Sequence, residues 1–307
     1  MKRNTMLGLL AGVCLASCSG VTLTPTPEKA MVNLQLDWGG ETARKTMKAY
    51  FYPTENTAGT SGLPVFLEGS GGEVSGQLPD GSYRLITYNT DVTGVAFSEM
   101  SSYQTATVAA AATSTRADVV LVEQPSAFYA CSQADGITTS LLDPLKLTAS
   151  PRQLTRTLNL KIRLSDVRGV DVITGTLNGM YPSLLLSTGA PAPESVASAP
   201  SVRSGFQIEH PSNEVEISLR TLGILNPENG KVYRSIMELV LRGNDGWSQA
   251  GTVDMTDVLT DIISKNNDDL PANAPVEIEM EIKAVGTALQ ATVKSWKQGS
   301  GDGYIYE

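Results

Sequence analysis

Few side chains in this 307-residue chain have the chemistry for catalysis or for binding a metal ion. The candidates are three cysteines and one histidine: Cys14, Cys18, Cys131 and His210. A cysteine nucleophile needs a base beside its thiol, and a zinc site needs several nitrogen and sulfur ligands, so a single histidine leaves little from which to build either. The sequence also lacks a Gly-rich phosphate loop and a Ser-His-Asp set. We therefore expect no catalytic residue, metal or cofactor, and the sequence argues against an enzyme.

The chemistry that the sequence does favour is modification of Cys18. Lys2 and Arg3 precede an apolar run at 6–14, which is shorter than the roughly 20 residues that span a bilayer, and small residues follow it. This segment is typical of a secretory signal, and it ends in Leu15-Ala16-Ser17-Cys18. That ending resembles the signals of bacterial lipoproteins, whose cysteine thiol is acylated before the signal is removed. The resemblance implies signal cleavage after Leu15, Ala16 and Ser17, and lipidation of Cys18 by a fatty acid such as palmitate. An ordinary signal peptide with an incidental cysteine is the alternative.

The charge balance of the chain argues against one class of partner. The chain has 23 Lys and Arg against 32 Asp and Glu, and this acidic balance argues against nucleic acid as a partner, because binding to phosphates requires clustered basic residues.

Once Cys14 leaves with the signal and Cys18 is acylated, Cys131 has no disulfide partner. We expect Cys131 to be a small buried apolar residue, and His210, in a polar turn before Pro211, to lie at the surface.

The first half of the mature chain has the alternation of half-buried strands. Residues 18–30 are a Pro/Thr tether, and strands are expected at these positions: 32–38, 48–52, 65–67, 83–88, 92–97 and 118–123. Pro79-Asp80-Gly81 predicts a turn, because proline presets its dihedral and glycine accepts a positive one. The Ala109–Ala112 run favours a weak helix or coil.

A proline-marked stretch at 141–153 is interpreted as a crossing between two domains. Strands are then expected at 158–164, 215–219, 237–241, 276–282 and 289–293, with two further pieces within 170–186. The Pro/Ala/Ser-rich loop at 187–205 is either a connector or a partner contact. The predicted organisation is as follows: signal peptide 1–17, tether 18–30, N-terminal β-sandwich 31–145, C-terminal β-sandwich 152–297 and flexible tail 298–307.

One short helix is expected in the second domain. Asp254 is predicted to cap it, and Asp257 lies in its first turn, where the helix dipole favours negative charge. Capping explains both carboxylates, so we reject a catalytic pair. The expected fold is therefore mainly β, with two tandem antiparallel β-sandwiches and one short helix in the second.

Several short motifs connect this pattern to a known family. They are Trp38 at the end of the first strand, Tyr50-Phe51-Tyr52-Pro53, Leu78-Pro79-x-Gly81-x-Tyr83 leading to Tyr88-Asn89, the Asp254-Met-Thr-Asp helix start, and Trp296 after the last strand. The Leu-Pro-x-Gly-x-Tyr turn is common in transthyretin-like sandwiches. Together with the signal, the motifs resemble the Bacteroidales fimbrillin-like lipoproteins, including minor-fimbrium anchor subunits and related uncharacterised Bacteroides lipoproteins.

The resemblance implies an outer-membrane lipoprotein that acts as a fimbrial anchor or accessory subunit in cell adhesion. Its partners would be the outer membrane, through the lipid, and pilin-like fimbrial subunits, through strand complementation at a sheet edge. No acidic run follows Cys18, so the sequence is consistent with a folded part on either the periplasmic or the cell-surface face of the outer membrane. The alternative is a glycan-binding surface lipoprotein, for which Trp247, beside the Gly-Asn-Asp-Gly turn, is the candidate aromatic platform.

Overall fold

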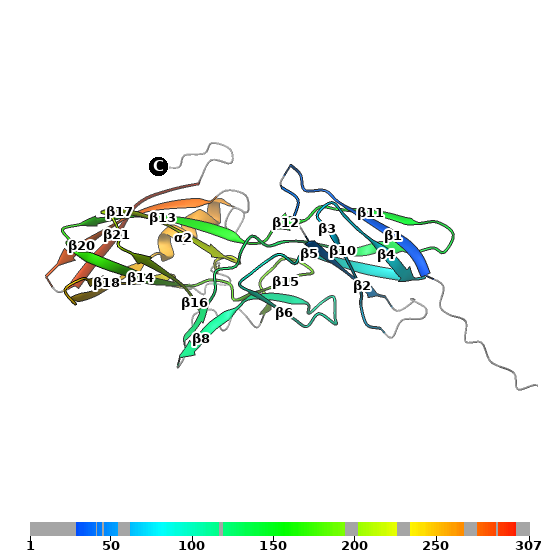
Figure 1. The fold of residues 1–307 in the computed structure, drawn as a ribbon, viewed down its shortest axis with the longest axis horizontal. Helices are drawn as coiled ribbons and strands as arrows, with labels where there is room; N and C mark the ends of the chain where they lie inside the picture. The colour runs from blue at the N-terminus through cyan, green and yellow to red at the C-terminus, as the bar shows by residue number, and fades with distance from the viewer. Residues whose placement is uncertain are drawn as a thin grey trace, which may run out of the picture.

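The computed structural model describes residues 29–40, 42–44, 46–54, 62–116, 119–193, 202–225, 234–266, 275–286 and 288–298. Figure 1 shows an elongated molecule with a β-sandwich at each end and a small sheet between them. Most strand pairings are antiparallel, whereas β1–β11, β13–β20 and β9–β16 are parallel. The predicted fold class, mainly β with tandem sandwiches and a short helix in the second, is confirmed for this part of the chain.

The first sandwich is one eight-stranded sheet that folds over on itself. Its strands in sheet order are β11 (Leu145–Ala149), β1 (Lys29–Leu36), β4 (Glu73–Pro79), β3 (Val65–Ser70), β2 (Thr46–Pro53), β5 (Ser82–Asn89), β10 (Tyr129–Thr138) and β12 (Arg152–Gln153). A single residue pair, Ser70 with Glu73, joins β3 to β4, so the sheet turns a corner there. Alternate side chains such as Leu34, Phe51 and Leu85 fill the space inside and are almost completely buried.

The second sandwich packs a four-stranded sheet against a six-stranded one. The smaller sheet is β17 (Glu214–Thr221), β13 (Arg156–Ser165), β20 (Val276–Val285) and β21 (Ala288–Gln298). The larger is β19 (Ser248–Asp254), β18 (Ile236–Gly243), β14 (Val170–Asn178), β16 (Val202–Glu209), β9 (Val119–Val122) and β8 (Ala112–Arg116). Helix α2 (Thr256–Lys265) adds Leu259, Ile262 and Ile263 to the core between the two sheets.

The two sandwiches exchange strands. β9 lies early in the chain, yet it pairs with β16 of the second sandwich, from Val202 opposite Val120 to Ser204 opposite Val122. In return, β15 (Ser183–Leu185) pairs with β7 (Thr107–Ala110), which pairs with β6 (Val95–Ser98). Strand pairing therefore crosses the predicted boundary at 145–152 in both directions, and β11 and β12 lie within the stretch interpreted as the crossing.

A third core holds the junction together. The small sheet covers the outer face of β2, β5 and β10, where these side chains from both halves of the chain are buried together: Ile86, Tyr88, Val108, Phe128, Leu184, Leu186 and Leu222. Burying a large apolar side chain contributes about 1.5–3 kcal/mol. We infer that this shared core stabilises the arrangement of the two sandwiches.

Hydrogen bonds around one turn explain the Leu-Pro-x-Gly-x-Tyr motif. The Tyr83 hydroxyl donates to the Pro79 carbonyl at 2.8 Å, and the hydroxyl of Thr139 donates to the same carbonyl at 3.0 Å. Gly81, whose φ is +154°, donates its N–H to the Thr139 hydroxyl at 2.8 Å. The motif thus fixes the β4–β5 turn to the end of β10.

Two local predictions are wrong. The Ala109–Ala112 run is not a helix, because Ala109 and Ala110 end β7 and Ala112 begins β8, with only Ala111 between the strands, so tertiary strand pairing overrides the helix propensity of alanine. The helix N-cap is Met255 rather than Asp254, although the Asp254 carboxylate still accepts the N–H of Thr256 at 3.0 Å. The alternating strands at 158–164, 215–219, 237–241 and 276–282 are confirmed. The sequence does not predict β4, β7, β8, β10, β11, β12, β16 or β19.

Candidate functional site

The residues predicted to carry the lipid lie outside the described residues. This applies to Leu15, Ala16, Ser17 and Cys18, to the tether as far as residue 28, and to the tail from residue 299. Lipidation therefore stays a prediction. Within the described ranges, no helix is long and apolar enough to cross a membrane, and no group of histidine, cysteine and carboxylate side chains could hold a metal ion.

Cys131 lies on β10 of the first sandwich, whereas His210 follows β16 of the second. Cys131 on β10 is partly exposed rather than fully buried, and its surroundings still raise the pKa of the thiol to about 12, chiefly through loss of solvation. A thiol with this pKa is neutral at physiological pH, so it is a poor nucleophile. His210 is exposed as predicted, in the turn between β16 and β17, with Nδ1 2.8 Å from Oδ1 of Asp171. Neither residue forms a catalytic arrangement.

Trp247, the predicted glycan platform, folds back over its own hairpin. The ring is half-buried against the core of the second sandwich, and a Cβ added to Gly243 would lie 1.9 Å from its Nε1. Glycine at 243 is therefore what lets the indole lie so close to the backbone. One side of the ring is used for this packing, which leaves less of it for stacking on a sugar.

Asp254 and Asp257 serve the start of α2. The Thr256 hydroxyl is the largest cause that lowers the pKa of Asp254, to about 2, and the Arg234 guanidinium adds to it. Nη2 of Arg234 lies 2.6 Å from Oδ2 of Asp254. A carboxylate held ionised in this way is a poor general acid at physiological pH.

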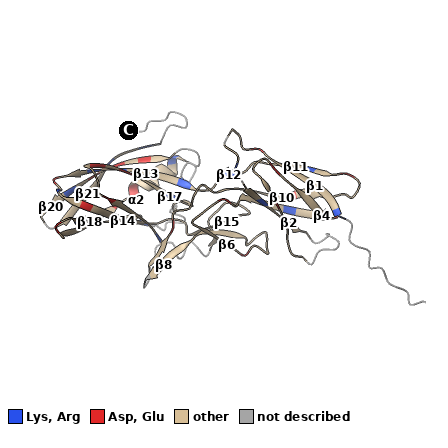
Figure 2. Ribbon diagram, viewed as in Figure 1, with Lys and Arg blue, Asp and Glu red and all other residues tan. Residues whose placement is uncertain are grey.

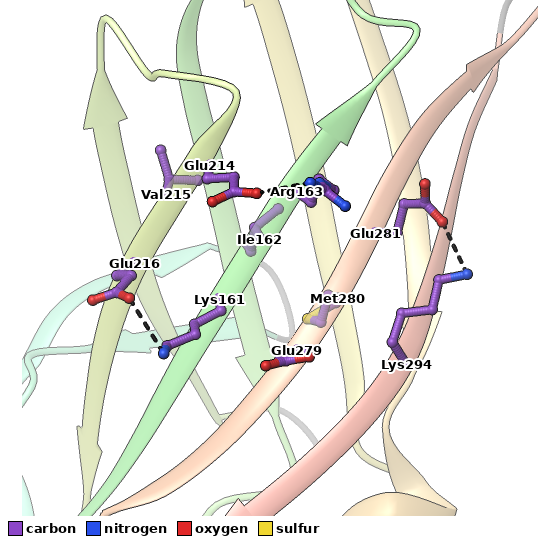
Figure 3. Close-up of a pocket in the computed structure, with 10 residues that line it drawn as sticks. All are labelled: Lys161, Ile162, Arg163, Glu214, Val215, Glu216, Glu279, Met280, Glu281 and Lys294. Carbon is purple, nitrogen blue, oxygen red and sulfur yellow. Dashed lines mark ion pairs between the residues drawn. The ribbon is translucent and has the colours of Figure 1, made fainter.

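A hollow lies on the outer face of the four-stranded sheet. It has a volume of about 650 Å³, and long charged side chains from β13, β17, β20 and β21 surround it. Figure 3 shows how these side chains face one another in pairs. Lys161 lies 3.5 Å from Glu216, Arg163 lies 3.1 Å from Glu214, and Lys294 lies 2.9 Å from Glu281.

These pairs neutralise one another. The Lys294 ammonium, followed by the Ser165 hydroxyl, lowers the pKa of Glu281 to about 2, and Glu277, followed by Glu216, raises the pKa of Lys161. Figure 2 shows the same mixture of acidic and basic residues along the strands of this sandwich. Both shifts favour the charged forms of Glu281 and Lys161, so neither side chain is a good general acid or base at physiological pH.

The edge of this sheet offers a different chemistry. β17 pairs with β13 on one side only, and at its end the N–H of Arg220 points outward, where Oε1 of Gln124 accepts it at 3.0 Å. Along an antiparallel edge strand, the backbone N–H and C=O groups of successive residues point alternately toward the paired strand and away from the sheet. Glu216 and Ser218 alternate in step with Arg220, so their N–H and C=O groups also point away from the sheet. Among the described residues these groups have no hydrogen-bond partner. We call this stretch, 214–218, the β17 edge.

The core beside the β17 edge is less completely covered than elsewhere. Val215 and Ile217, which point inward from this edge, are 9% and 8% exposed, whereas Ile162 and Ile278 in the middle of the same sheet are 1% and 0% exposed. Phe206 and Ile208 on β16 are half-buried against this core. A strand added beside β17 would gain backbone hydrogen bonds and could set alternate side chains against these residues.

Most other strands at the ends of the sheets are shorter than β17, which has eight residues. β8 and β11 have five residues each, β6 has four, β15 has three and β12 has two. On the far side of the second sandwich, β19 and β21 lie against each other: Nε2 of Gln249 donates to the Gly286 carbonyl at 3.2 Å, and a Cβ on Gly251 would lie 2.7 Å from Leu289. The β17 edge is therefore the best candidate for a docking strand in the described part of the chain. The sequence indicated that 215–219 is a strand, but contained no signal for its place at an edge.

Comparisons with known proteins agree with this fold. Residues 17–198, more than half of the chain, match the family described as Domain of unknown function (DUF5119). No curated protein matches the sequence. A candidate adhesin from Bacteroides ovatus ATCC 8483 superposes with a TM-score of 0.62 at 17% identity, covering 91% of this chain and 96% of the other.

Two further solved structures are similar. A second candidate adhesin from Bacteroides ovatus has a TM-score of 0.52 at 11% identity and covers 90% of this chain and 97% of its own. The fimbrial anchor protein Mfa2 from Porphyromonas gingivalis has a TM-score of 0.48 at 12% identity, covering 89% of this chain and 97% of its own. At these identities, the first two likenesses show the fold.

Proposed function

The chain belongs to the DUF5119 family, and from this premise we propose that it is an outer-membrane lipoprotein that anchors or joins a fimbrium. In this proposal an acyl group on Cys18 holds the protein at the membrane. The folded part binds pilin-like subunits by strand addition and carries out no catalysis.

The sequence around Cys18 supports the anchor. The basic start, short apolar run and Leu-Ala-Ser-Cys ending fit a lipoprotein signal, and the family match begins at residue 17, directly before Cys18. One acyl chain alone gives marginal, reversible binding to a bilayer, so stable attachment requires a second chain or a further membrane contact. The adhesin names of the two Bacteroides ovatus proteins support a role in adhesion at the cell envelope.

The β17 edge is the single observation that carries the binding mode. Its outward backbone groups at Glu216 and Ser218 have no partner among the described residues, and half-buried Phe206 and Ile208 lie on the neighbouring strand of the opposite sheet. Backbone hydrogen bonds would give such a complex its affinity, and the alternate side chains of the incoming strand would give it specificity.

Recovery of the acylated full chain from outer membranes tests this function. We expect fimbrial subunits to co-purify with the tagged protein, as identified by mass spectrometry. A glycan array probed with the wild type and with Trp247→Ala runs in parallel. Binding to a sugar that is lost in Trp247→Ala, without co-purifying subunits, would contradict the proposal in favour of the glycan-binding alternative.

A further inference from the structure

Two exposed leucines lie in the loop between β10 and β11. The side chain of Leu142 is 89% exposed and that of Leu141 is 43% exposed, which makes Leu142 the most exposed large apolar side chain in the described part of the chain. Single exposed apolar residues are common, but a neighbouring pair at a loop tip is a candidate contact with an apolar phase.

The loop lies at the end of the molecule from which the tether emerges. β1 and β11 are parallel, with Val32 opposite Leu145, so residues 139–144 lie beside the start of β1 at Lys29. Lys29 in turn lies opposite Pro79 of the β4–β5 turn. Figure 1 shows the start of β1 and the loop before β11 at the same end of the first sandwich.

The base of the loop is fixed. The Thr139 N–H donates to the Gly81 carbonyl at 2.9 Å, and the Thr139 hydroxyl donates to the Pro79 carbonyl at 3.0 Å. The hydroxyl of Ser140 accepts the N–H of Leu142 at 3.3 Å. These hydrogen bonds hold the base of the loop in place, so Leu141 and Leu142 are exposed at a defined position at this end of the first sandwich.

From the predicted acylation site, eleven residue steps lead to Lys29. An extended chain of this length spans about 36 Å, and a flexible one has a typical end-to-end distance of about 18 Å. This end of the body is therefore the part that a lipid on Cys18 would hold nearest to the bilayer. Among the described residues, the exposed charges beside the loop are Lys29, Lys146, Asp80 and Asp143, and these two positive and two negative charges balance, so their net charge neither attracts the loop to an anionic bilayer nor repels it.

We propose that the 140–144 loop docks on the membrane surface, with Leu141 and Leu142 inserted at the boundary between headgroups and acyl chains. This rests on the proposed lipid anchor. Docking at this end would turn the second sandwich, with the β17 edge, away from the bilayer and toward incoming subunits.

The test uses the acylated full chain reconstituted into phosphatidylethanolamine–phosphatidylglycerol vesicles. An environment-sensitive fluorophore is placed by Leu142→Cys in a Cys131→Ser background. The control is Val285→Cys, because Val285 is also apolar and 57% exposed, in the β20–β21 turn of the second sandwich. We expect a blue shift and strong quenching by spin-labelled lipids at 142, and neither effect at 285.

Equal and negligible quenching at both positions, on protein that floats with the vesicles, would overturn the docking proposal alone. Protein that fails to float at all would contradict the lipid anchor instead. A blue shift at 142 that grows with protein density but shows no lipid quenching would assign the leucines to contact between copies of the chain and would overturn membrane docking. As a second variant, Leu141→Ser with Leu142→Ser should abolish the blue shift of a fluorophore at Ser140→Cys while the protein still floats.

Discussion

Replacing Cys18 by alanine is expected to move the protein from the membrane fraction to the soluble fraction. Without the thiol no acyl chain can be attached, so the proposed lipid anchor is lost. Each buried methylene of an acyl chain contributes about 0.8 kcal/mol, so loss of the lipid exceeds the effect of any single surface substitution. Fractionation and metabolic labelling with a fatty-acid probe provide the measurement.

Cys131→Ala is the matched control for this substitution. Cys131 is the other cysteine that remains after signal removal, and it lies on β10, partly exposed and without a disulfide. This variant should retain both the label and the membrane fraction. If Cys18→Ala stayed with the membrane to the same extent as the wild type, the lipid anchor would be refuted.

Ser218→Pro is expected to abolish capture of fimbrial subunits while the protein stays folded. The Ser218 N–H points outward from the β17 edge, so proline there removes no bond of the ladder with β13, and proline is tolerated on such edges. A docking strand, however, would lose one hydrogen bond and meet the proline ring. A lost hydrogen bond alone corresponds to about 0.5–1.5 kcal/mol, and the steric clash adds to it.

Ser218→Ala separates the backbone effect from that of the side chain. It keeps the N–H and removes only the hydroxyl, which donates to Oδ1 of Asn159 at 2.7 Å. We expect normal capture by Ser218→Ala, loss of capture by Ser218→Pro, and similar thermal unfolding for both. Equal capture by the two variants would show that partners bind elsewhere.

The sequence alone predicts those strands and turns whose pattern depends on residues close together in the chain. The strict alternation in β13 and β20 arises because one face of each strand lies on the core and the other in water. The motif at Leu78–Tyr83 was also readable, since its turn depends on residues close together in the chain. Its link to Thr139, nearly sixty residues later, was not.

The features of the fold that the sequence does not predict depend on strand pairing between residues far apart in the chain. Nothing in Val119–Val122 specifies that β9 joins β16, about eighty residues later and in the other sandwich. The same topology decides that β17 lies at an edge, and edge and central strands with one buried face share the same alternation. The helix prediction for the alanine run at 109–112 is wrong for the same reason. Its strand conformation is imposed by pairing with β6, β9 and β15.

The residues around Trp247 favour the packing that its ring adopts. Gly243 and Trp247 flank the turn residues of one hairpin, and the glycine leaves room for the indole to lie against the backbone. Gly243 donates its N–H to the Trp247 carbonyl, and an aromatic residue paired with a glycine across two strands can cover that glycine. This pattern indicates a structural role at least as strongly as a sugar platform.

The strand exchange between the sandwiches bears on how the protein would carry load. A membrane anchor at one end and a partner strand on the second sandwich would pull along the long axis of the molecule. The β9–β16 and β7–β15 pairings and the buried junction around Phe128 would resist this pull. Independent motion of the two sandwiches would require these pairings to break, so we expect them to move as one unit.

Site-specific photo-cross-linking in the assembled fimbrium tests the central claim most directly. A photoreactive residue replaces Glu216 on the β17 edge or, as the control, Thr292 on the opposite edge strand β21. Strand addition along β17 predicts a cross-link from position 216 to a neighbouring fimbrial subunit and none from position 292. A subunit cross-linked from 292 and not from 216, or from neither position in intact fimbriae, would contradict it.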